Sequence, residues 1–257
     1  MKQYKVGIIG ATGMVGQRFA LLLENHPWFK VTALAASARS AGKTYKECVE
    51  NRWAMTSPIP KAMEDMVVMD ATADIEKIAS QVDFVFCAVD MKKDEIKALE
   101  EAYAKAECPV ISNNSAHRHT PDVPMIVPEL NADHAAIIPA QRKRLGTKRG
   151  FIAVKSNCSL QSYVPAIFPL NKFGVKDVLV CTYQAISGAG KNVLVVGFDA
   201  TDDAVEAVKA GRMGGTIAQQ PALLGATAVE NAVSLINGQS IEKNIPVEVT
   251  LITKDNA

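Results

Sequence analysis

The stretch KVGIIGATGMVG, residues 5–16, decides the fold class of this 257-residue chain. An apolar run typical of a buried strand leads directly into closely spaced glycines, where a helix is expected to begin. The glycines form a G-x-x-G-x-x-G variant of the fingerprint in which backbone approaches a pyrophosphate at a helix N-terminus. The alternative is a glycine turn that only lets strand and helix pack closely. The candidate nucleotide contacts are Gly10, Thr12, Gly13, Met14, Val15 and Gly16.

Strand-like and helical stretches alternate outward from this loop. A helix is expected over residues 14–26, strands over 30–37 and 82–89, a helix over 92–107 and a strand over 108–113. This alternation predicts an α/β fold with a Rossmann-type parallel sheet domain over residues 1–132. The proline-containing stretch HTPDVPMIVPELN that follows favours a crossing between domains over a helix.

The remainder of the chain reads as two further segments. A strand within residues 151–159, a helix over 160–174 and a strand over 176–187 are expected in the first of these segments, placed at 133–191. Beyond it, alternating strands and helices predict a short, compact βαβαβ segment over 192–257.

Composition argues for a small-molecule partner. The 28 basic residues balance 27 acidic ones, so charge gives no reason to expect nucleic acid or an anionic membrane. The N-terminus shows no signal peptide or membrane span, which predicts a cytoplasmic chain. The cysteines are odd in number, widely spaced and without a CxxC pair, so reduced thiols are expected rather than disulfides or a zinc site. They are Cys48, Cys87, Cys108, Cys158 and Cys181.

The residues after the second expected strand bear on the choice of cofactor. NAD-specific sites usually place a carboxylate there to bind the ribose hydroxyls, and this chain has AASARSAGK instead. Its hydroxyls and cations suit a 2′-phosphate, which favours NADP over NAD. The alternative is a solvated polar loop. The residues concerned are Ser37, Arg39, Ser40 and Lys43.

Cys158 is the candidate nucleophile. It follows an apolar strand and precedes a helix, so its sulfur is expected near a helix N-terminus, which favours the thiolate. A thiolate that attacks an aldehyde forms a thiohemiacetal, hydride transfer gives a thioester, and phosphate then releases an acyl phosphate. A cysteine without supporting motifs is more often a core residue.

Four motifs in order carry a family resemblance: GATGMVG, SNNSAHRHTPDVPMIVPELN, KSNCS and TYQAISGAG. Together they resemble the aspartate-semialdehyde dehydrogenase family. That resemblance implies NADP-dependent reductive dephosphorylation of aspartyl phosphate to aspartate semialdehyde, a step in lysine, threonine and methionine biosynthesis. It implies that Cys158 is the nucleophile, that Gln184 orients the acyl intermediate, and that Asn157 lies against substrate or nicotinamide.

The same resemblance assigns the anion and further cofactor contacts. Arg118 matches the arginine that holds phosphate, although by itself it is equally consistent with a surface residue. Ser112, Asn113, Ser187 and Gly188 resemble positions near the cofactor. His117 and His119 have no carboxylate or thiolate at metal-binding spacing, so no metal is predicted.

The resemblance ends after TYQAISGAG, so it implies that residues 133–191 are the beginning of the family's α+β catalytic domain, which is truncated here. The family continues through a segment that forms its dimer and carries a catalytic histidine and a substrate-binding arginine, whereas all histidines of this chain precede Cys158. Impaired turnover is therefore expected. A homo-oligomer stays open, but the family's dimer segment is largely absent.

Residues from about 193 instead resemble the C-terminal part of ribose-type periplasmic sugar-binding proteins. In that family Asp199 and Gln219 would contact sugar hydroxyls; in isolation they are equally consistent with loop and helix caps. The join near residues 191–194 suggests the hypothesis of a chimera, whether an engineered fusion, a recombined gene or a mis-assembled reading frame. The competing functions are a dehydrogenase-family chain, a binding module and a scaffold without enzymatic activity.

Overall fold

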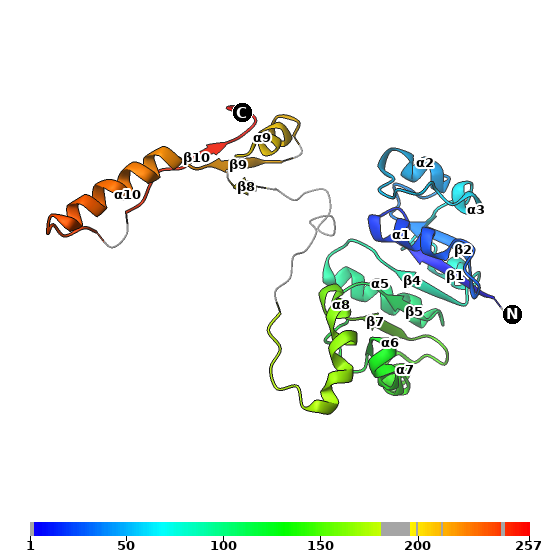
Figure 1. Cartoon of the computed structure of the whole chain (residues 1–257). Coiled ribbons are helices and arrows are strands. Elements are labelled where there is room, and N and C mark those ends of the chain that lie inside the picture. Colours follow the sequence, from blue (N-terminus) through cyan, green and yellow to red (C-terminus); the bar gives the residue numbers. More distant parts are fainter. Residues whose placement is uncertain (1–2, 181–195, 199, 212, 243–244) are drawn as a thin grey trace. The chain divides into compact units, whose positions relative to one another are not determined.

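The chain divides into two compact units, Met1–Gln184 and Ala185–Ala257. A computed structural model describes residues 3–180, 196–198, 200–211, 213–242 and 245–257 (Figure 1). Among these residues, no helix is both long and apolar enough to cross a membrane. Each unit is described by itself.

The first unit is built on a seven-stranded sheet in the order β3-β2-β1-β4-β5-β7-β6. Every neighbouring pair in it is parallel. The α/β class and the Rossmann-type sheet predicted from residues 5–16 are therefore confirmed. The strands are β1 (Tyr4–Ile9), β2 (Phe29–Ala36), β3 (Met69–Asp70), β4 (Phe84–Cys87), β5 (Val110–Ser112), β6 (Met125–Ile126) and β7 (Ile152–Lys155).

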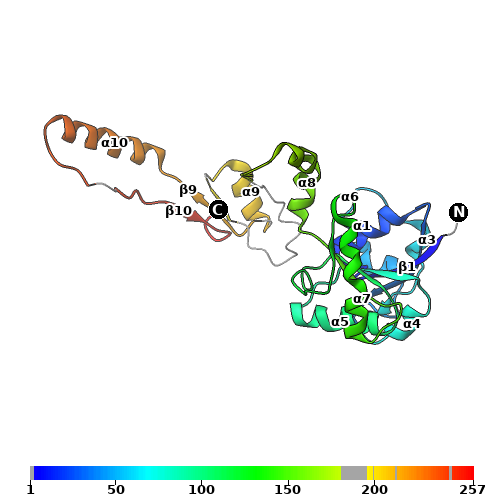
Figure 2. The same cartoon turned by 90° about the horizontal axis from the view of Figure 1, so that it is seen from below.

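Helices cover both faces of this sheet (Figure 2). On one face pack α1 (Met14–Leu23), α2 (Tyr45–Val49) and α3 (Lys61–Glu64), and on the other α4 (Ile75–Ala79), α5 (Lys93–Lys105) and α7 (Ile138–Leu145). The remaining helices of the unit are the short η1 (Glu50–Arg52), α6 (Pro128–Asn131) and η2 (Ala132–Ile137), followed by α8 (Cys158–Ile167) and η3 (Phe168–Phe173).

The central parts of the long strands β1 and β2 are apolar because both of their faces are buried there. Successive side chains of a strand point to opposite faces, so Ile8 of β1 joins the core beneath α1 whereas Ile9 joins the core beneath α5. In β2, Leu34 likewise joins the core beneath α1, and Ala35 joins the core beneath α5. This is why the strand runs read as continuous apolar stretches rather than as alternating ones.

Residues 133–184 do not separate from the Rossmann sheet. We expected a second domain from residue 133, yet β7 lies between β5 and β6 in the first sheet, and Leu145 of α7 joins the core beneath α5. The proline-containing stretch, interpreted as a crossing between domains, contributes the edge strand β6 and the short α6. An edge strand tolerates prolines beside it because one of its sides has no hydrogen-bonding partner strand.

The strand expected over 176–187 is absent over 176–180, the part that lies within the described residues. The apolar side chains there are exposed, with Leu179 102% exposed. A strand needs a neighbour for its backbone groups, and no described strand lies alongside. The helix expected over 160–174 begins earlier, at Cys158, and continues as η3 from Phe168.

The second unit has the predicted βαβαβ order. Its elements are β8 (Val196–Phe198), α9 (Asp202–Lys209), β9 (Gly215–Ala218), α10 (Pro221–Ile236) and β10 (Thr250–Ile252). The sheet order is β10-β9-β8, with β8 parallel and β10 antiparallel to β9. The expectation of a compact segment is wrong for α10, whose Val229, Val233 and Ile236 are exposed. A sheet of three short strands offers little surface to cover a helix of 16 residues.

Candidate active site

The candidate site lies along one edge of the first sheet. Because the strands are parallel, their carboxyl ends meet at the same edge, and the glycine loop, the 37–43 turn, residues 112–118 and residues 156–158 each follow one of these ends. The chain runs outward from β1 to β2 and β3, then returns to β4 on the other side of β1. Ligands of open α/β sheets bind at such a switch point.

The glycines of the loop are needed for two different structural reasons. Gly10 has φ +87°, and a Cβ there would lie 2.4 Å from the Ala88 carbonyl oxygen; a Cβ on Gly16 would lie 2.2 Å from the Gly10 carbonyl oxygen. For these two positions the close-packing interpretation holds. At Gly13, the exposed N-cap of α1, the nearest atom would be 3.5 Å away. Its missing side chain instead leaves the helix N-terminus open to a ligand.

Two buried side chains that the sequence analysis missed support this loop. The Tyr45 hydroxyl donates to the Ala11 carbonyl oxygen at 3.0 Å, and burial raises the pKa of Tyr45. The Gln17 amide donates to the carbonyl oxygens of Thr12 and Arg52, both at 3.2 Å, and accepts from the backbone N–H of Ala54 at 2.8 Å. The loop backbone is therefore held in place. Thr12 is buried, whereas Met14 and Val15 are exposed at the start of α1.

The 37–43 turn lies next to the glycine loop, since the backbone N–H groups of Gly10 and Ala11 both donate to the Ala35 carbonyl oxygen. Ser37, Arg39 and Lys43 are exposed there. Ser40 differs from the expectation of a surface hydroxyl because it is buried. Its backbone N–H donates to the Ser37 carbonyl oxygen at 2.8 Å, which closes the turn.

Cys158 is the first residue of α8 and is exposed, as its position between strand and helix predicts. The Asn157 side chain caps this helix by accepting from the Ser159 backbone N–H at 2.9 Å. Burial raises the pKa of the Cys108 thiol to about 12, and that of Cys87 also lies well above its usual range. Cys48 is half-buried, and Cys181 lies outside the described residues.

Two cations meet at the end of β7, the strand that leads to the nucleophile. Arg118 donates from Nε to the Lys155 carbonyl oxygen at 3.2 Å, which brings the 112–118 segment against this strand end. Burial lowers the pKa of Lys155, the Cys158 sulfur opposes this, and the Arg118 charge lowers it further. The sequence analysis did not assign Lys155, whose only signal is the first letter of KSNCS. Two cations at the strand end that precedes a nucleophile suit an anionic substrate.

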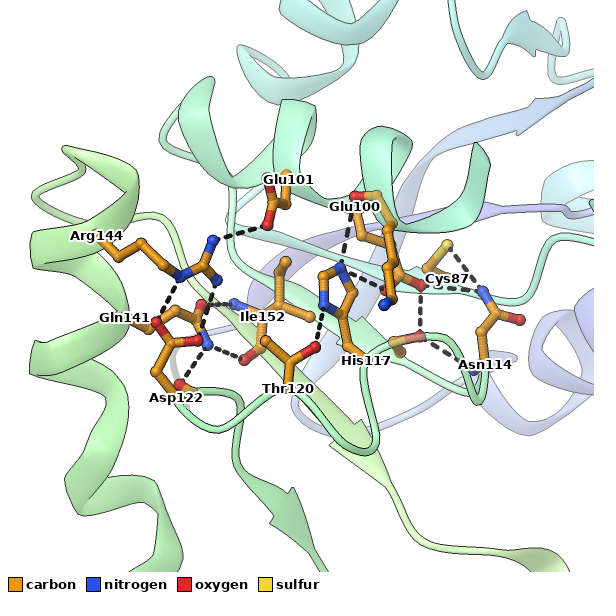
Figure 3. Close-up of polar contacts among 12 residues, drawn as sticks. Cys87, Glu100, Glu101, Asn114, His117, Thr120, Asp122, Gln141, Arg144 and Ile152 are labelled. Atoms are coloured by element: carbon orange, nitrogen blue, oxygen red, sulfur yellow. Dashed lines mark hydrogen bonds and ion pairs between the residues drawn. The ribbon is translucent and has the colours of Figure 1, made fainter. Parts of the chain in front are cut away.

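The segment that carries Arg118 is tied to α5 (Figure 3). Ser112 is buried, and its hydroxyl donates to Oε1 of Glu100 at 2.5 Å while it accepts from the Asn114 backbone N–H at 3.0 Å. Asn113 is half-buried and donates its backbone N–H to the Cys87 carbonyl oxygen at 2.8 Å. Sequence analysis also missed Glu100, because a carboxylate on a helix normally signals a solvated face.

Most of the remaining candidate residues lie outside the described residues. They are Gln184, Ser187, Gly188 and Asp199, and their assignments stay predictions. Gln219 follows β9 in the second unit and is exposed.

This fold and edge geometry define a nicotinamide-nucleotide-binding domain of Rossmann type joined to a cysteine site. Residues 5–138 match the protein family described as semialdehyde dehydrogenase, NAD binding domain. The chain belongs to this semialdehyde dehydrogenase family. Residues 172–240 match a second family, described as periplasmic binding protein domain, which agrees with the second resemblance.

Individual relatives agree with the match to the semialdehyde dehydrogenase family. The aspartate-semialdehyde dehydrogenase of Cryptococcus neoformans is 46% identical over 190 residues, covering 73% of this chain and 51% of the relative. That of Aspergillus fumigatus is 44% identical over 188 residues, covering 72% and 50%. The crystal structure of the Candida albicans enzyme with NADP is similar with a TM-score of 0.58 and 36% identity, covering 67% of this chain and 48% of that one. The chain thus spans about half the length of these relatives.

Proposed function

We propose that the first unit acts as the front part of an NADP-dependent aspartate-semialdehyde dehydrogenase, which reductively dephosphorylates aspartyl phosphate to aspartate semialdehyde. One observation carries this proposal: an exposed cysteine at a helix N-terminus shares a sheet edge with the glycine loop and follows the strand end at which Lys155 and Arg118 meet. A small-molecule substrate and phosphate are the partners this proposal requires, and a cytoplasmic location goes with it.

The proposed chemistry proceeds through Cys158. Its thiolate attacks the acyl carbon of aspartyl phosphate, the carbon–oxygen bond to phosphate breaks, and phosphate leaves with the electron pair. Arg118 and Lys155 hold the phosphate oxygens, and Gln184 orients the resulting thioester. The nicotinamide cofactor supplies the hydride that reduces this thioester. Collapse of the thiohemiacetal then breaks the carbon–sulfur bond, releases the aldehyde and restores the thiolate.

NADP is the proposed cofactor because the turn beside the glycine loop offers an exposed guanidinium, an exposed ammonium and an exposed hydroxyl, and no carboxylate, over residues 37–43. The glycine loop itself leaves the N-terminus of α1 open for the pyrophosphate at Gly13. Ser112 and Asn113 would contribute through the backbone of their segment, since the Ser112 hydroxyl is already bonded to Glu100.

Turnover by the 257-residue chain is proposed to be impaired. All of its histidines, His26, His117, His119 and His134, precede Cys158, and the chain spans about half the length of its dehydrogenase relatives. Loss of a positioned acid or base typically costs about 10²–10⁴-fold in rate.

A second candidate is a chimeric chain without enzymatic activity that carries a fragment of a sugar-binding protein. The match of residues 172–240 to a periplasmic binding protein domain favours this candidate. Asp199 and Gln219 would then serve as the hydroxyl-binding pair. A sugar site normally needs a partner lobe, which the 257 residues do not supply.

Calorimetric titration with NADPH, followed by a phosphate-dependent assay with aspartate semialdehyde and NADP, separates these candidates. Binding with weak or no turnover supports the first proposal. Turnover at the rate expected of an intact enzyme would contradict the impairment, and absence of NADPH binding would contradict the dehydrogenase proposal in favour of the second. Cys158→Ser is the control, because it should bind NADPH like the wild type and remove any turnover.

A further inference from the structure

Glu100 is a fully buried carboxylate that the proposed mechanism leaves without a role. It lies on α5 with 0% of its surface exposed. Its Oε1 accepts from the Ser112 hydroxyl at 2.5 Å and from the Asn114 side-chain amide at 3.0 Å. Its Oε2 makes no hydrogen bond within the described residues and lies 4.0 Å from Nε2 of His117. Burying a carboxylate costs free energy unless other groups pair with it, so the groups that contact Glu100 indicate its role.

Those partners all belong to one segment, residues 112–117, which leads directly to Arg118 (Figure 3). His117 is itself buried, and its Nδ1 lies 3.1 Å from the Thr120 hydroxyl. One carboxylate thus contacts the start, the middle and the end of a turn that has no regular secondary structure. Hydrogen bonds to a carboxylate are stronger than those between neutral groups, so they hold such a turn firmly.

The far side of the same turn is fixed separately. Arg144 of α7 bonds the Asp122 carboxylate at 2.5 and 3.0 Å and Glu101 at 2.8 Å. Gln141 donates to the carbonyl oxygens of Asp122 and Ile152, both at 2.9 Å. Arg118 therefore lies between two anchored stretches, and Glu100 supplies the anchor on its N-terminal side.

We propose that Glu100 is a positioning residue for the anion site: through Ser112, Asn114 and His117 it holds Arg118 where its guanidinium meets anions arriving at Cys158. This inference rests on the proposed function, because it takes Arg118 and Cys158 as parts of one site. The bond from Arg118 Nε to the Lys155 carbonyl oxygen at 3.2 Å joins this residue to the strand end that leads to Cys158.

The test compares how fast Cys158 reacts with iodoacetate, an anion, and with neutral iodoacetamide, using mass spectrometry of the Cys158 peptide of the full chain. The ratio of the two rate constants measures the attraction of anions to the thiolate. Arg118→Ala should lower this ratio about fivefold, the effect of removing one charge at a few ångströms in water. Glu100→Ala should lower it to a similar value with little change in the iodoacetamide rate, and the double variant should show no further loss.

Conservative variants separate positioning from general structural damage. Glu100→Gln keeps an oxygen for Ser112 and Asn114 and should restore most of the ratio. Asp94→Asn, which removes an exposed carboxylate from the first turn of the same helix, is the matched control and should leave the ratio unchanged. If Glu100→Ala does not fold, Glu100→Asp replaces it: it withdraws the oxygens by one methylene and should lower the ratio by about twofold or more.

Each possible result supports or overturns the positioning role of Glu100. A lowered ratio in Arg118→Ala with an unchanged ratio in Glu100→Ala or Glu100→Asp would overturn the positioning role and leave the proposed anion site intact. An unchanged ratio in Arg118→Ala would overturn both. An equal loss in Asp94→Asn would show that the helix as a whole matters rather than Glu100.

Discussion

The glycines of the 10–16 loop show how single residues with the same sequence signal differ in their surroundings. Gly10 and Gly16 face backbone atoms at distances that no side chain tolerates, whereas Gly13 opens on free space. A fingerprint of three glycines thus combines two requirements of the fold with one position that is open for a ligand.

Alanine substitutions should separate these requirements. Gly16→Ala should destabilise the protein by about 2 kcal/mol, because its methyl group would overlap the loop backbone. Gly13→Ala should unfold at nearly the same denaturant concentration as the wild type yet weaken NADPH binding, because the methyl group occupies the approach to the helix N-terminus. Denaturation and calorimetric titration measure the two effects. Unchanged NADPH affinity in a folded Gly13→Ala would contradict the nucleotide site.

Arg39 gives a test of cofactor preference. Its side chain is exposed in the turn beside the glycine loop, so Arg39→Ala should weaken NADP binding much more than NAD binding. Lys143→Ala, which removes an exposed cation from α7, is the control and should change neither affinity. Equal losses for both cofactors in Arg39→Ala would remove this residue from the 2′-phosphate site.

Cys158 should be the most rapidly alkylated of the five cysteines in the folded chain. It is exposed at a helix N-terminus, whereas Cys87 and Cys108 are buried and burial raises the pKa of both thiols. Iodoacetamide labelling with peptide mapping measures the order, and labelling in denaturant is the control in which the differences should vanish. Equal rates for all cysteines in the folded protein would contradict the assignment of the nucleophile.

Elements of the first unit are joined by single side chains as well as by the sheet. Glu107, just past the end of α5, accepts from the backbone N–H groups of Lys148, Arg149 and Gly150 at 2.8, 2.5 and 2.8 Å. These bonds hold the pKa of Glu107 down at about 2. The end of α5 is thereby connected to the residues that lead into β7.

Acid should weaken this connection in a defined range. Because the folded-state pKa of Glu107 lies below its ordinary value of 4.5, its contribution to stability is present above about pH 4.5 and is lost as the pH falls towards 2. Glu107→Gln should therefore be less stable than the wild type at pH 7, with a smaller difference at pH 3.5. Urea denaturation at the two pH values measures it. Glu76→Gln, on the exposed surface of α4, should show no such trend; a difference independent of pH in Glu107→Gln would contradict the assignment.

The whole molecule consists of two units with different family matches, over residues 5–138 and 172–240. Both core clusters of the first unit, the glycine loop, the 37–43 turn and Cys158 lie within the described residues 3–180. All residues that we assign to the cofactor within this range therefore belong to the first unit.

A chain shortened to residues 1–180 should fold and still bind NADPH, with at most a modest loss of affinity from removing Ser187 and Gly188, because it retains both cores and the nucleotide edge. Calorimetric titration and thermal unfolding of both chains measure this. A large loss of affinity in the shortened chain would show that residues beyond 180, among them Ser187 and Gly188, contribute to the cofactor site.

Local patterns were sufficient for the fold class and for the strand ends at which the candidate site residues lie. The apolar runs and the glycines at the junction of the first strand and helix predicted the Rossmann sheet, because strand burial and helix-terminus geometry depend on adjacent residues. Parallel pairing of the strands then brings residues 10–16, 37–43, 118 and 157–158 to one edge. The sequence predicted where strands occur along the chain, but it did not predict their order across the sheet.

What only the tertiary structure decided depends on contacts between distant residues. The placement of β7 between β5 and β6 removed the boundary expected at residue 132, because pairing partners are chosen by the packing of the whole sheet. Glu100 and Gln17 look like residues of solvated helix faces in the sequence, and become anchors of the site because the fold buries them against polar backbone and side-chain groups. The periodicity of a helix or strand can be recognised from the sequence alone. Whether a polar side chain is buried depends on which residues surround it in the folded structure.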